Sequence, residues 1–282
     1  MGTRRADFAG SWYPGTKREC INTIKEYIEA IPVPAGEYMG HGGIVPHAGW
    51  YFSGKTAFSV YSSISSRKSP GLIFLFGMHL PAGSPDYIFI DDSIETPIGN
   101  LSVHRKACEM LTGSFDFIEE DASSCTRDNT LEMQFPLIKY LFPDTGVVLL
   151  GVSPREQALR IGEKAAEIAD ELGNEACLIG STDLTHYGPN YGFTTMGTGK
   201  KSVEWVKKVN DKRMVDAFLR AEPNEVMSEA ASSYNACCPG GVAAAIAGIR
   251  KSGAGKGTLV HYTTSYDINP DSSFVGYAGV VY

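Results

Sequence analysis

The chain has 282 residues, 43% of them hydrophobic and 20% charged, and carries a formal net charge of −7. This length allows one large α/β domain or two ordinary domains, and this composition is typical of a soluble globular protein with ample core material. The acidic balance argues against a nucleic-acid-binding surface, which would need clustered Lys and Arg side chains.

The sequence indicates neither a membrane segment nor a disulfide framework. No apolar run reaches the ~20 residues that a spanning helix requires, and residues 1–10 lack the apolar core of a signal peptide. We therefore expect a cytoplasmic protein without membrane attachment. The six cysteines are scattered apart from the adjacent pair Cys237 and Cys238, and no CxxC zinc pair occurs.

The first part of the chain predicts a strand that ends at a histidine. Residues 8–15 form a turn-rich opening loaded with aromatics, and residues 19–31 place apolar side chains at helical spacing. An apolar run then stops at Pro46, which can close a strand because its missing N–H is not needed beyond the last ladder bond. His47 would lie at the carboxyl end of that strand, where open α/β sheets bind ligands. The alternative is a histidine whose hydrogen bonds are satisfied within the core.

A second strand followed by a histidine comes next. Residues 55–63 predict a helix, and residues 72–76 are a continuous apolar pentad, typical of a strand buried on both faces. The pentad stops at Gly77, and His79 lies two residues beyond it. Two strands of one parallel sheet could thus deliver His47 and His79 to the same edge.

Strands and helices alternate through the rest of the chain, with a turn expected at residues 96–101. We expect strands at residues 87–90, 146–152, 176–180, 257–264 and 274–282, and helices at residues 105–111, 131–142, 154–172, 203–219, 223–233 and 242–250. This alternation indicates an α/β protein with a largely parallel central sheet flanked by helices. No linker or composition break divides the chain, so we expect a single domain over residues 1–282.

A third buried strand runs into a polar segment that contains Asp183 and His186. With a thiolate at Cys238, the imidazoles of His47 and His79 would form a ligand set of the kind found in non-haem iron sites, which leave positions open for oxygen and substrate. The same set would also hold zinc or copper. The alternative is that these histidines cap strands by hydrogen bonding and share no metal.

Several motifs in this order resemble the Memo family over nearly the whole chain. They are Phe-Ala-Gly-Ser-Trp-Tyr at residues 8–13, Pro-His-Ala-Gly at 46–49, Leu-Glu-Met-Gln-Phe-Pro at 131–136, Ser-Thr-Asp-Leu-Thr-His-Tyr-Gly at 181–188, Asp-Ser-Ser at 271–273 and Tyr-Ala-Gly at 277–279. The chain is identified as a member of that family by their shared order.

The resemblance implies a fold shared with the class III extradiol ring-cleaving dioxygenases. In the Memo family, the pocket equivalent to their iron site is lined by two histidines and a cysteine, which carry over to His47, His79 and Cys238. Iron(II) is the expected metal, and copper and zinc are alternatives. The pattern is also compatible with a protein that is isolated without bound metal. The turn before His79 is one residue shorter than the family's usual turn, and Asn129 stands where the family usually has a histidine.

The resemblance also implies roles for residues around the metal ligands. Asp183 and His186 carry over as pocket neighbours, and the histidine resembling His186 acts on the substrate as acid or base in the dioxygenases, which suits its titration range. The aromatic side chains of Trp12, Trp50 and Tyr187 could stack on a flat ligand, although aromatic core packing is the alternative.

Three functions follow from the resemblance, and the sequence leaves open whether the chain is an enzyme. The first is an oxygen-dependent oxidoreductase that acts on a small molecule at a mononuclear iron. The second is a non-catalytic binding module for a phosphorylated or otherwise anionic peptide, and the third is a redox-metal (iron or copper) binding protein. Animal Memo proteins are associated with phosphotyrosine-peptide binding, metal binding and redox signalling. A homo-oligomer is compatible with all three functions.

Overall fold

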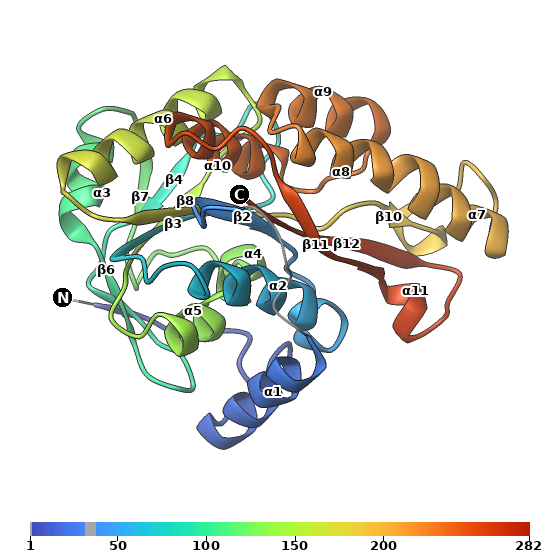
Figure 1. Cartoon of the computed structure of the whole chain (residues 1–282), viewed down its shortest axis with the longest axis horizontal. Helices are drawn as coiled ribbons and strands as arrows, with labels where there is room; N and C mark the ends of the chain where they lie inside the picture. The colour runs from blue at the N-terminus through green and yellow to red at the C-terminus, as the bar shows by residue number, and fades with distance from the viewer. Residues whose placement is uncertain (1, 32–37) are drawn as a thin grey trace.

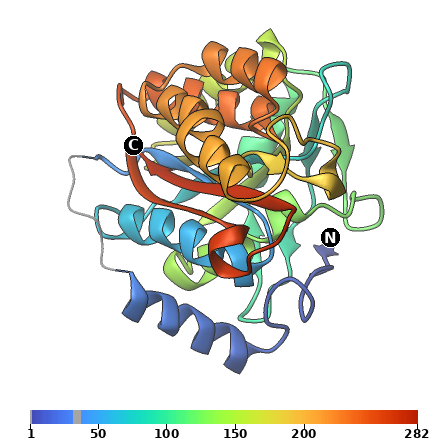
Figure 2. The same ribbon diagram turned by 90° about the vertical axis from the view of Figure 1, so that its right-hand side faces the viewer.

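The computed structural model describes residues 2–31 and 38–282, and a mixed sheet runs through it with helices on both faces (Figures 1 and 2). The strands of this sheet are β1 (Thr3–Arg4), β2 (Gly42–Val45), β3 (Leu72–Gly77), β4 (Tyr87–Phe89), β5 (Ser93–Ile94), β6 (Leu101–Val103), β7 (Ile118–Glu120), β8 (Gly146–Gly151), β9 (Ala176–Ser181), β10 (His186–Tyr187), β11 (Thr258–Thr264) and β12 (Phe274–Val281).

The centre of the sheet is parallel, as the apolar runs predict. The strand order is β1-β5-β6-β8-β3-β9-β2-β12-β10, and the neighbours from β6 to β2 all pair in parallel. Every residue of β3 is buried, because helices cover both faces of the strand. β12 joins β2 antiparallel and also carries β10 and β11 as antiparallel partners. The expectation of a single α/β domain with a mostly parallel sheet is confirmed.

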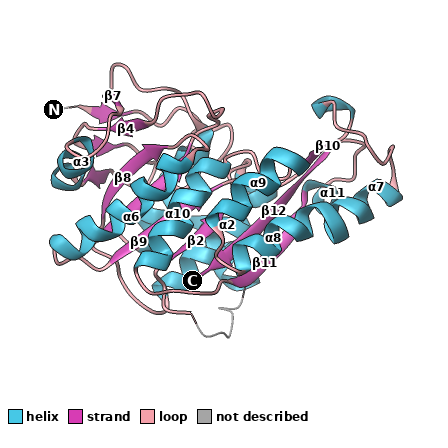
Figure 3. Cartoon of the chain, turned by 90° about the horizontal axis from the view of Figure 1, so that it is seen from above, coloured by secondary structure: helices cyan, strands magenta, loops and turns pink. Residues whose placement is uncertain are grey.

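The helices form two layers. Their bounds are α1 (Lys17–Ala30), α2 (Trp50–Ser65), α3 (Arg105–Thr112), α4 (Asn129–Glu132), α5 (Phe135–Leu141), α6 (Glu156–Glu171), α7 (Lys200–Trp205), α8 (Asp211–Leu219), α9 (Pro223–Ser233), α10 (Pro239–Lys251) and α11 (Ser265–Ile268), with a 3-10 turn η1 (Pro189–Tyr191) and a π-helical turn η2 (Val206–Asn210). α6 and α10 cover one face of the sheet, and α2 and α5 cover the other (Figure 1). α7 and β10 project at the end of the molecule away from the N-terminus (Figure 3).

Two predicted helices differ from the observed ones for identifiable reasons. α2 begins at Trp50, so Gly54 lies inside the helix and not before it. This glycine lets α2 pack closely on α1, because a Cβ on Gly54 would lie 2.4 Å from the Tyr27 hydroxyl oxygen. The helix expected at residues 131–142 is divided into α4 and α5. Pro136 has no N–H to continue the ladder from α4, and instead occupies the first turn of α5, where its missing donor has no consequence.

Small residues bring α6 and α10 close together over the sheet. A Cβ on Gly162 of α6 would lie 1.8 Å from the carbonyl oxygen of Ala244 on α10, and a Cβ on Gly248 would lie 2.5 Å from the carbonyl oxygen of Gly162. The two backbones therefore touch at this crossing. This contact fixes α10, whose N-terminus carries the cysteine pair at residues 237–238.

Candidate metal centre

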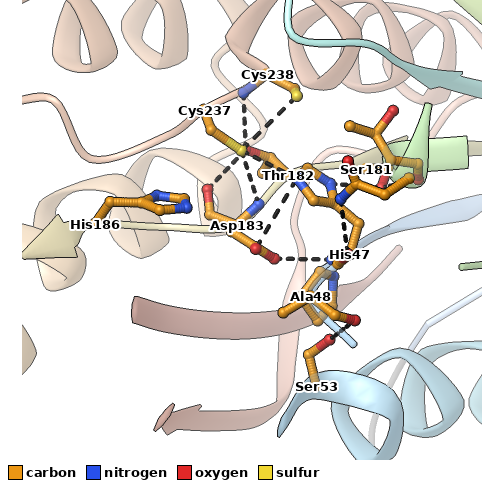
Figure 4. Close-up of polar contacts among 12 residues, drawn as sticks. His47, Ala48, Ser53, Ser181, Thr182, Asp183, His186, Cys237 and Cys238 are labelled. Atoms are coloured by element: carbon orange, nitrogen blue, oxygen red, sulfur yellow. Dashed lines mark hydrogen bonds and ion pairs between the residues drawn. The ribbon is translucent and has the colours of Figure 1, made fainter. Parts of the chain in front are cut away.

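Two histidines and two cysteines from three separate segments meet at one edge of the sheet. His47 follows β2, His79 follows β3, and Cys237 and Cys238 precede α10. One ligand atom of each residue lies within 4.8 Å of the ligand atoms of the other three. Figure 4 shows His47 and both cysteines facing one another. The structure thus brings together His47, His79 and Cys238 as expected, while their role as ligands stays a prediction.

Cys237, which the sequence could not separate from Cys238 as a ligand, also has contacts at this centre. Its Sγ lies 3.2 Å from His47 Nε2, 3.7 Å from Cys238 Sγ, and 3.3 Å from the main-chain nitrogen of Asp183, which donates to it. Cys237 is half-buried, whereas Cys238 is buried. Adjacent residues outside a regular element give no sequence signal for which side chain turns inward. Cys237 therefore joins Cys238 as a candidate ligand.

A hydrogen-bond chain determines which ring nitrogen of His47 faces the sulfurs. His47 Nδ1 lies 3.0 Å from Ser181 Oγ, and Ser181 Oγ donates its single proton to the carbonyl oxygen of Thr130 at 2.7 Å. The serine oxygen must therefore accept from His47 Nδ1–H. In the neutral ring, Nε2 then carries the lone pair and points at Cys237. This is the arrangement in which a neighbouring group orients a metal-binding imidazole.

The charges at this centre are strongly perturbed. Burial alone would keep the His47 ring neutral, but the negative charges of Asp183 and Cys237 outweigh it and raise the pKa of His47 to about 9. Burial likewise opposes a thiolate at Cys237, but the hydrogen bond from Cys238 and the charge of His47 hold the pKa of Cys237 well below its usual range. Burial and the neighbouring Cys237 raise the pKa of the Cys238 thiol. Of the two sulfurs, Cys237 is therefore the one whose surroundings favour the thiolate.

Asp183 and His186 both lie beside this group. The Asp183 carboxylate accepts a hydrogen bond from the main-chain N–H of His47 at 2.8 Å, and burial raises the pKa of Asp183. His186 Nδ1 lies 3.2 Å from the carbonyl oxygen of Leu184. Because a carbonyl only accepts, Nδ1 carries the proton, and Nε2 of the neutral His186 ring is free to accept one.

A cavity of about 550 Å³ opens over the two histidines. His47, His79, Asn129, Asp183 and His186 line it together with an aromatic rim. That rim consists of Trp12, Tyr51, Phe52, Tyr191 and Tyr277. A cavity of this size, with polar groups converging at one end, fits a small-molecule ligand.

Of the three aromatics predicted for the substrate pocket, the structure places only Trp12 on this cavity. Trp50 is buried, its Nε1 donates to the carbonyl oxygen of Met133, and it lines a neighbouring cavity instead. Tyr187 is fully buried, and its hydroxyl donates to the carbonyl oxygen of Gly197. Tyr191, 47% exposed, takes the place beside His186, with ring centroids 5.0 Å apart.

The segment at α4 holds both histidine-bearing loops. Asn129 Nδ2 donates to the His47 carbonyl oxygen at 3.1 Å, and the main-chain N–H of Met78 donates to Thr130 Oγ1 at 2.7 Å. Met78 adopts a left-handed conformation with φ of 67°, which turns the chain sharply before His79. The short turn thus still delivers His79 to the site, and Asn129 lies at the cavity wall.

A buried carboxylate connects the N-terminal motif to the same segment. Glu132 Oε1 accepts from the main-chain N–H of Phe8 at 2.7 Å and from the Tyr13 hydroxyl at 3.0 Å. Arg4 lies 3.7 Å from the other oxygen of Glu132. Both Arg4 and Glu132 are buried, and burial raises the pKa of Glu132. The motif at residues 8–13 and the motif at residues 131–136 therefore contact each other beside Trp12 at the cavity rim.

The Memo-like protein family profile matches residues 4–281 of this chain. The chain belongs to the Memo-like family. MEMO1 family proteins from Pyrococcus furiosus (29% identical) and Thermococcus onnurineus (30% identical) are among its relatives. The alignments cover 99% of this chain and 98% of the Pyrococcus protein, and 97% of both chains for the Thermococcus protein.

One solved structure, of an uncharacterised protein from Escherichia coli K12, is similar with a TM-score of 0.44 and 10% identity, covering 79% of this chain and 91% of that one. A likeness at this level carries no argument about function. Within the part of this Memo-like chain that the structure describes, no helix combines the length and apolar character needed to cross a bilayer.

Proposed function

We propose that this Memo-like protein binds a transition metal through His47, His79 and Cys237, with Cys238 as an adjacent fourth donor. The observation that carries the proposal is the approach of all four ligand atoms to within 4.8 Å of one another beside a cavity. We further propose that this cavity holds a small molecule for oxygen-dependent oxidation.

The donor set fits a first-row transition metal. Two sulfurs that bind one zinc ion at ~2.3 Å each in tetrahedral geometry lie roughly 3.8 Å apart. Cys237 Sγ and Cys238 Sγ are 3.7 Å apart. Imidazole and thiolate suit iron, copper and zinc alike, and the orientation of His47 by Ser181 leaves its Nε2 lone pair directed into the group.

Iron(II) is the metal that the resemblance to class III extradiol dioxygenases favours, and when bound it would supply redox and Lewis-acid chemistry. The chain's own residues supply the remaining functions. Trp12, Tyr51 and Tyr191 offer flat faces to an aromatic ligand. The Nδ1–H of His186 donates to the carbonyl oxygen of Leu184, which leaves Nε2 as the acceptor. His186 Nε2 would therefore take up a proton from a substrate hydroxyl.

A second candidate function, redox-metal binding without turnover, is favoured by Cys238. Sites with four protein ligands are closed, whereas catalytic sites keep a position for water or substrate. A metal held by both sulfurs and both imidazoles would have no such position in tetrahedral geometry. The role of Cys238 therefore separates the two functions.

The test is metal analysis of protein purified without chelator or a nickel-affinity tag, followed by anaerobic titration calorimetry with iron(II), zinc(II) and copper(I). We expect Cys237→Ser to weaken binding by at least tenfold, because it removes the thiolate while nearly keeping its volume. Cys125→Ser is the matched control, since Cys125 is a half-buried cysteine outside the group.

Cys238→Ser decides between the two functions. Unchanged affinity would favour an open site and the oxidoreductase, and a loss equal to that of Cys237→Ser would favour a closed site and metal binding alone. If neither cysteine variant changes affinity for any of the three metals, the metal-site proposal is wrong.

A further inference from the structure

Two adjacent cysteines at the start of α10 point their sulfurs toward each other. Cys237 Sγ and Cys238 Sγ are 3.7 Å apart, and Cys238 is the N-cap residue of the helix. The main-chain N–H of Cys237 donates to the Asp183 carbonyl oxygen at 3.2 Å, and that of Cys238 donates to Thr182 Oγ1 at 3.2 Å. Both residues are thus held by the segment after β9, so the sulfurs stay on the same side of the chain.

The two sulfurs have unequal surroundings. Cys237 is half-buried beside His47 and Asp183, which line the cavity, and it receives the Asp183 main-chain N–H and faces the His47 ring. The Asp183 N–H donor stabilises negative charge on this sulfur. Cys238 is only 1% exposed and lies behind Cys237. Of the two residues, Cys237 is the more exposed.

We propose that Cys237 and Cys238 form a peroxide-responsive dithiol that closes reversibly to a disulfide between adjacent residues. Redox-active cysteines share this arrangement of an accessible nucleophilic sulfur next to a resolving thiol. The oxidant is hydrogen peroxide or a small organic hydroperoxide.

The reaction has two steps. The Cys237 thiolate attacks one peroxide oxygen, a sulfur–oxygen bond forms, the oxygen–oxygen bond breaks, and the hydroxide released takes up a proton to become water. Cys238 then loses its proton, and its sulfur attacks Cys237 Sγ and expels the hydroxyl group, which leaves with that proton as a second water. With hydrogen peroxide, two thiols are oxidised by two electrons, and one peroxide is reduced to two waters.

The disulfide should be easily reduced. Adjacent Cα atoms across a trans peptide are about 3.8 Å apart, whereas disulfides usually join Cα atoms about 4.4–6.8 Å apart. The small ring is therefore strained, and strained disulfides have the more oxidising potentials typical of labile bonds. A switch of this kind would reset with an ordinary thiol reductant.

The other four cysteines provide internal controls. Cys20, Cys108 and Cys177 are buried, and burial raises the pKa of each thiol to about 12. Cys125 is half-buried, as Cys237 is, but burial raises its pKa as well. None of the four should form a disulfide within the chain at low peroxide.

Disulfide formation stands independently of metal binding, but one consequence rests on the proposed function. Closing the disulfide removes both thiol donors from the group at His47 and His79, so the oxidised protein should lose its metal. The switch would then couple peroxide exposure to metal release.

The experiment treats metal-free protein with one equivalent of hydrogen peroxide, denatures it, alkylates it and measures its intact mass. We expect two of the six thiols to become resistant to alkylation, the unalkylated protein to lose the mass of two hydrogens, and a peptide map to place the crosslink at residues 237–238. Dithiothreitol should restore all six thiols. Six alkylated thiols after peroxide, or a Cys237 oxidised to the sulfinic acid beside a free Cys238, would overturn the proposal.

Variants identify the order of the two steps. Cys238→Ser should stop at the sulfenic acid of Cys237, which dimedone traps as a stable adduct, whereas Cys237→Ser should give neither adduct nor crosslink. Cys125→Ser should crosslink as the parent does. If the disulfide forms but the reduced protein binds no metal, the proposed function fails and the dithiol stands. If metal binds but no disulfide forms, the dithiol proposal fails and the proposed function stands.

Discussion

At the scale of single residues, Ser181 connects the sheet to the proposed ligands. It is the last residue of β9, and its hydroxyl accepts from His47 and donates to the Thr130 carbonyl oxygen. Since Thr130 Oγ1 also accepts from the main-chain N–H of Met78, one short chain of hydrogen bonds connects the His47 ring to the backbone turn before His79.

The change Ser181→Ala should weaken metal binding by about 10- to 100-fold, the usual effect of removing a group that orients a ligand. The ring of His47 would lose the acceptor for Nδ1–H and could place either nitrogen toward the sulfurs. Calorimetric titration of the metal-free protein with zinc(II) measures the effect.

Ser63→Ala is the control for Ser181→Ala. Ser63 is also a buried serine, but it donates to the Ser59 carbonyl oxygen inside α2. An equal loss of affinity in both variants would mean that general destabilisation, and not the orientation of His47, weakens the metal.

Asp211 is a buried carboxyl group behind the His186 segment. It accepts from the main-chain N–H and the hydroxyl of Thr185 and from the Tyr262 hydroxyl. Burial outweighs these hydrogen bonds and raises the pKa of Asp211 to about 6. The π-helical turn η2 ends immediately before Asp211, whose side chain is fully buried.

The raised pKa makes Asp211 a source of pH-dependent stability. Between about pH 4 and 6, the folded state binds a proton that the unfolded state has released, so this contribution favours folding at low pH and is lost as pH rises through 6. Asp211→Asn should remove it. The free energy of unfolding at pH 7 relative to pH 4 should therefore be higher in the variant than in the parent by on the order of 2–3 kcal/mol.

Urea unfolding at pH 4, 5, 6 and 7 measures this difference. Asn keeps a carbonyl oxygen for the Thr185 donors and an amide that can donate to Tyr262, so packing changes little. Asp144→Asn, at an exposed turn before β8, is the control and should keep the parental pH dependence. Parallel curves for the parent and Asp211→Asn would contradict the assignment.

At the scale of secondary structure, the contact between α6 and α10 limits side-chain size. Gly162→Ala should destabilise the fold by about 1–3 kcal/mol, because its Cβ would overlap the Ala244 carbonyl oxygen and force the helices apart. This loss should exceed the gain of about 1 kcal/mol that alanine gives a helix interior over glycine. The midpoint of urea unfolding reports the net change.

Gly255→Ala is the matched substitution, since a Cβ on Gly255 meets no atom within 4 Å. It should leave the midpoint nearly unchanged. A stabilised Gly162→Ala would show that the two helices can separate without loss of packing.

The element predictions succeeded where one local signal was decisive. The strands β3, β8 and β9 are buried on both faces, and a short continuous apolar run bounded by glycine is typical of such strands. The helix start predicted after Gly54 is wrong, because the close approach of Gly54 to Tyr27 depends on a tertiary contact. The short strands β1, β5 and β7 have two or three residues each, too few for a period to be visible.

At the scale of the whole molecule, the rule that strand ends share a sheet edge located His47, His79 and His186 near one another. It could not separate Cys237 from Cys238, because the direction of a side chain at a helix N-cap depends on the contacts of Thr182 and Asp183. Nor could it show that Tyr187 turns into a separate buried cluster with Phe274.

The place of β12 in the sheet has a consequence for biosynthesis. Val280 and Val281 pair with Ile44 and Gly43 on the strand that precedes His47, and Val275 and Tyr277 line the cavity. During translation, all four proposed ligands leave the ribosome before this strand does. Until then, the nascent chain exposes one edge of β2 and lacks part of the cavity wall. The proposed centre is therefore enclosed only once β12 has been made, and a chain that stalls before residue 274 would carry every donor without part of the cavity wall.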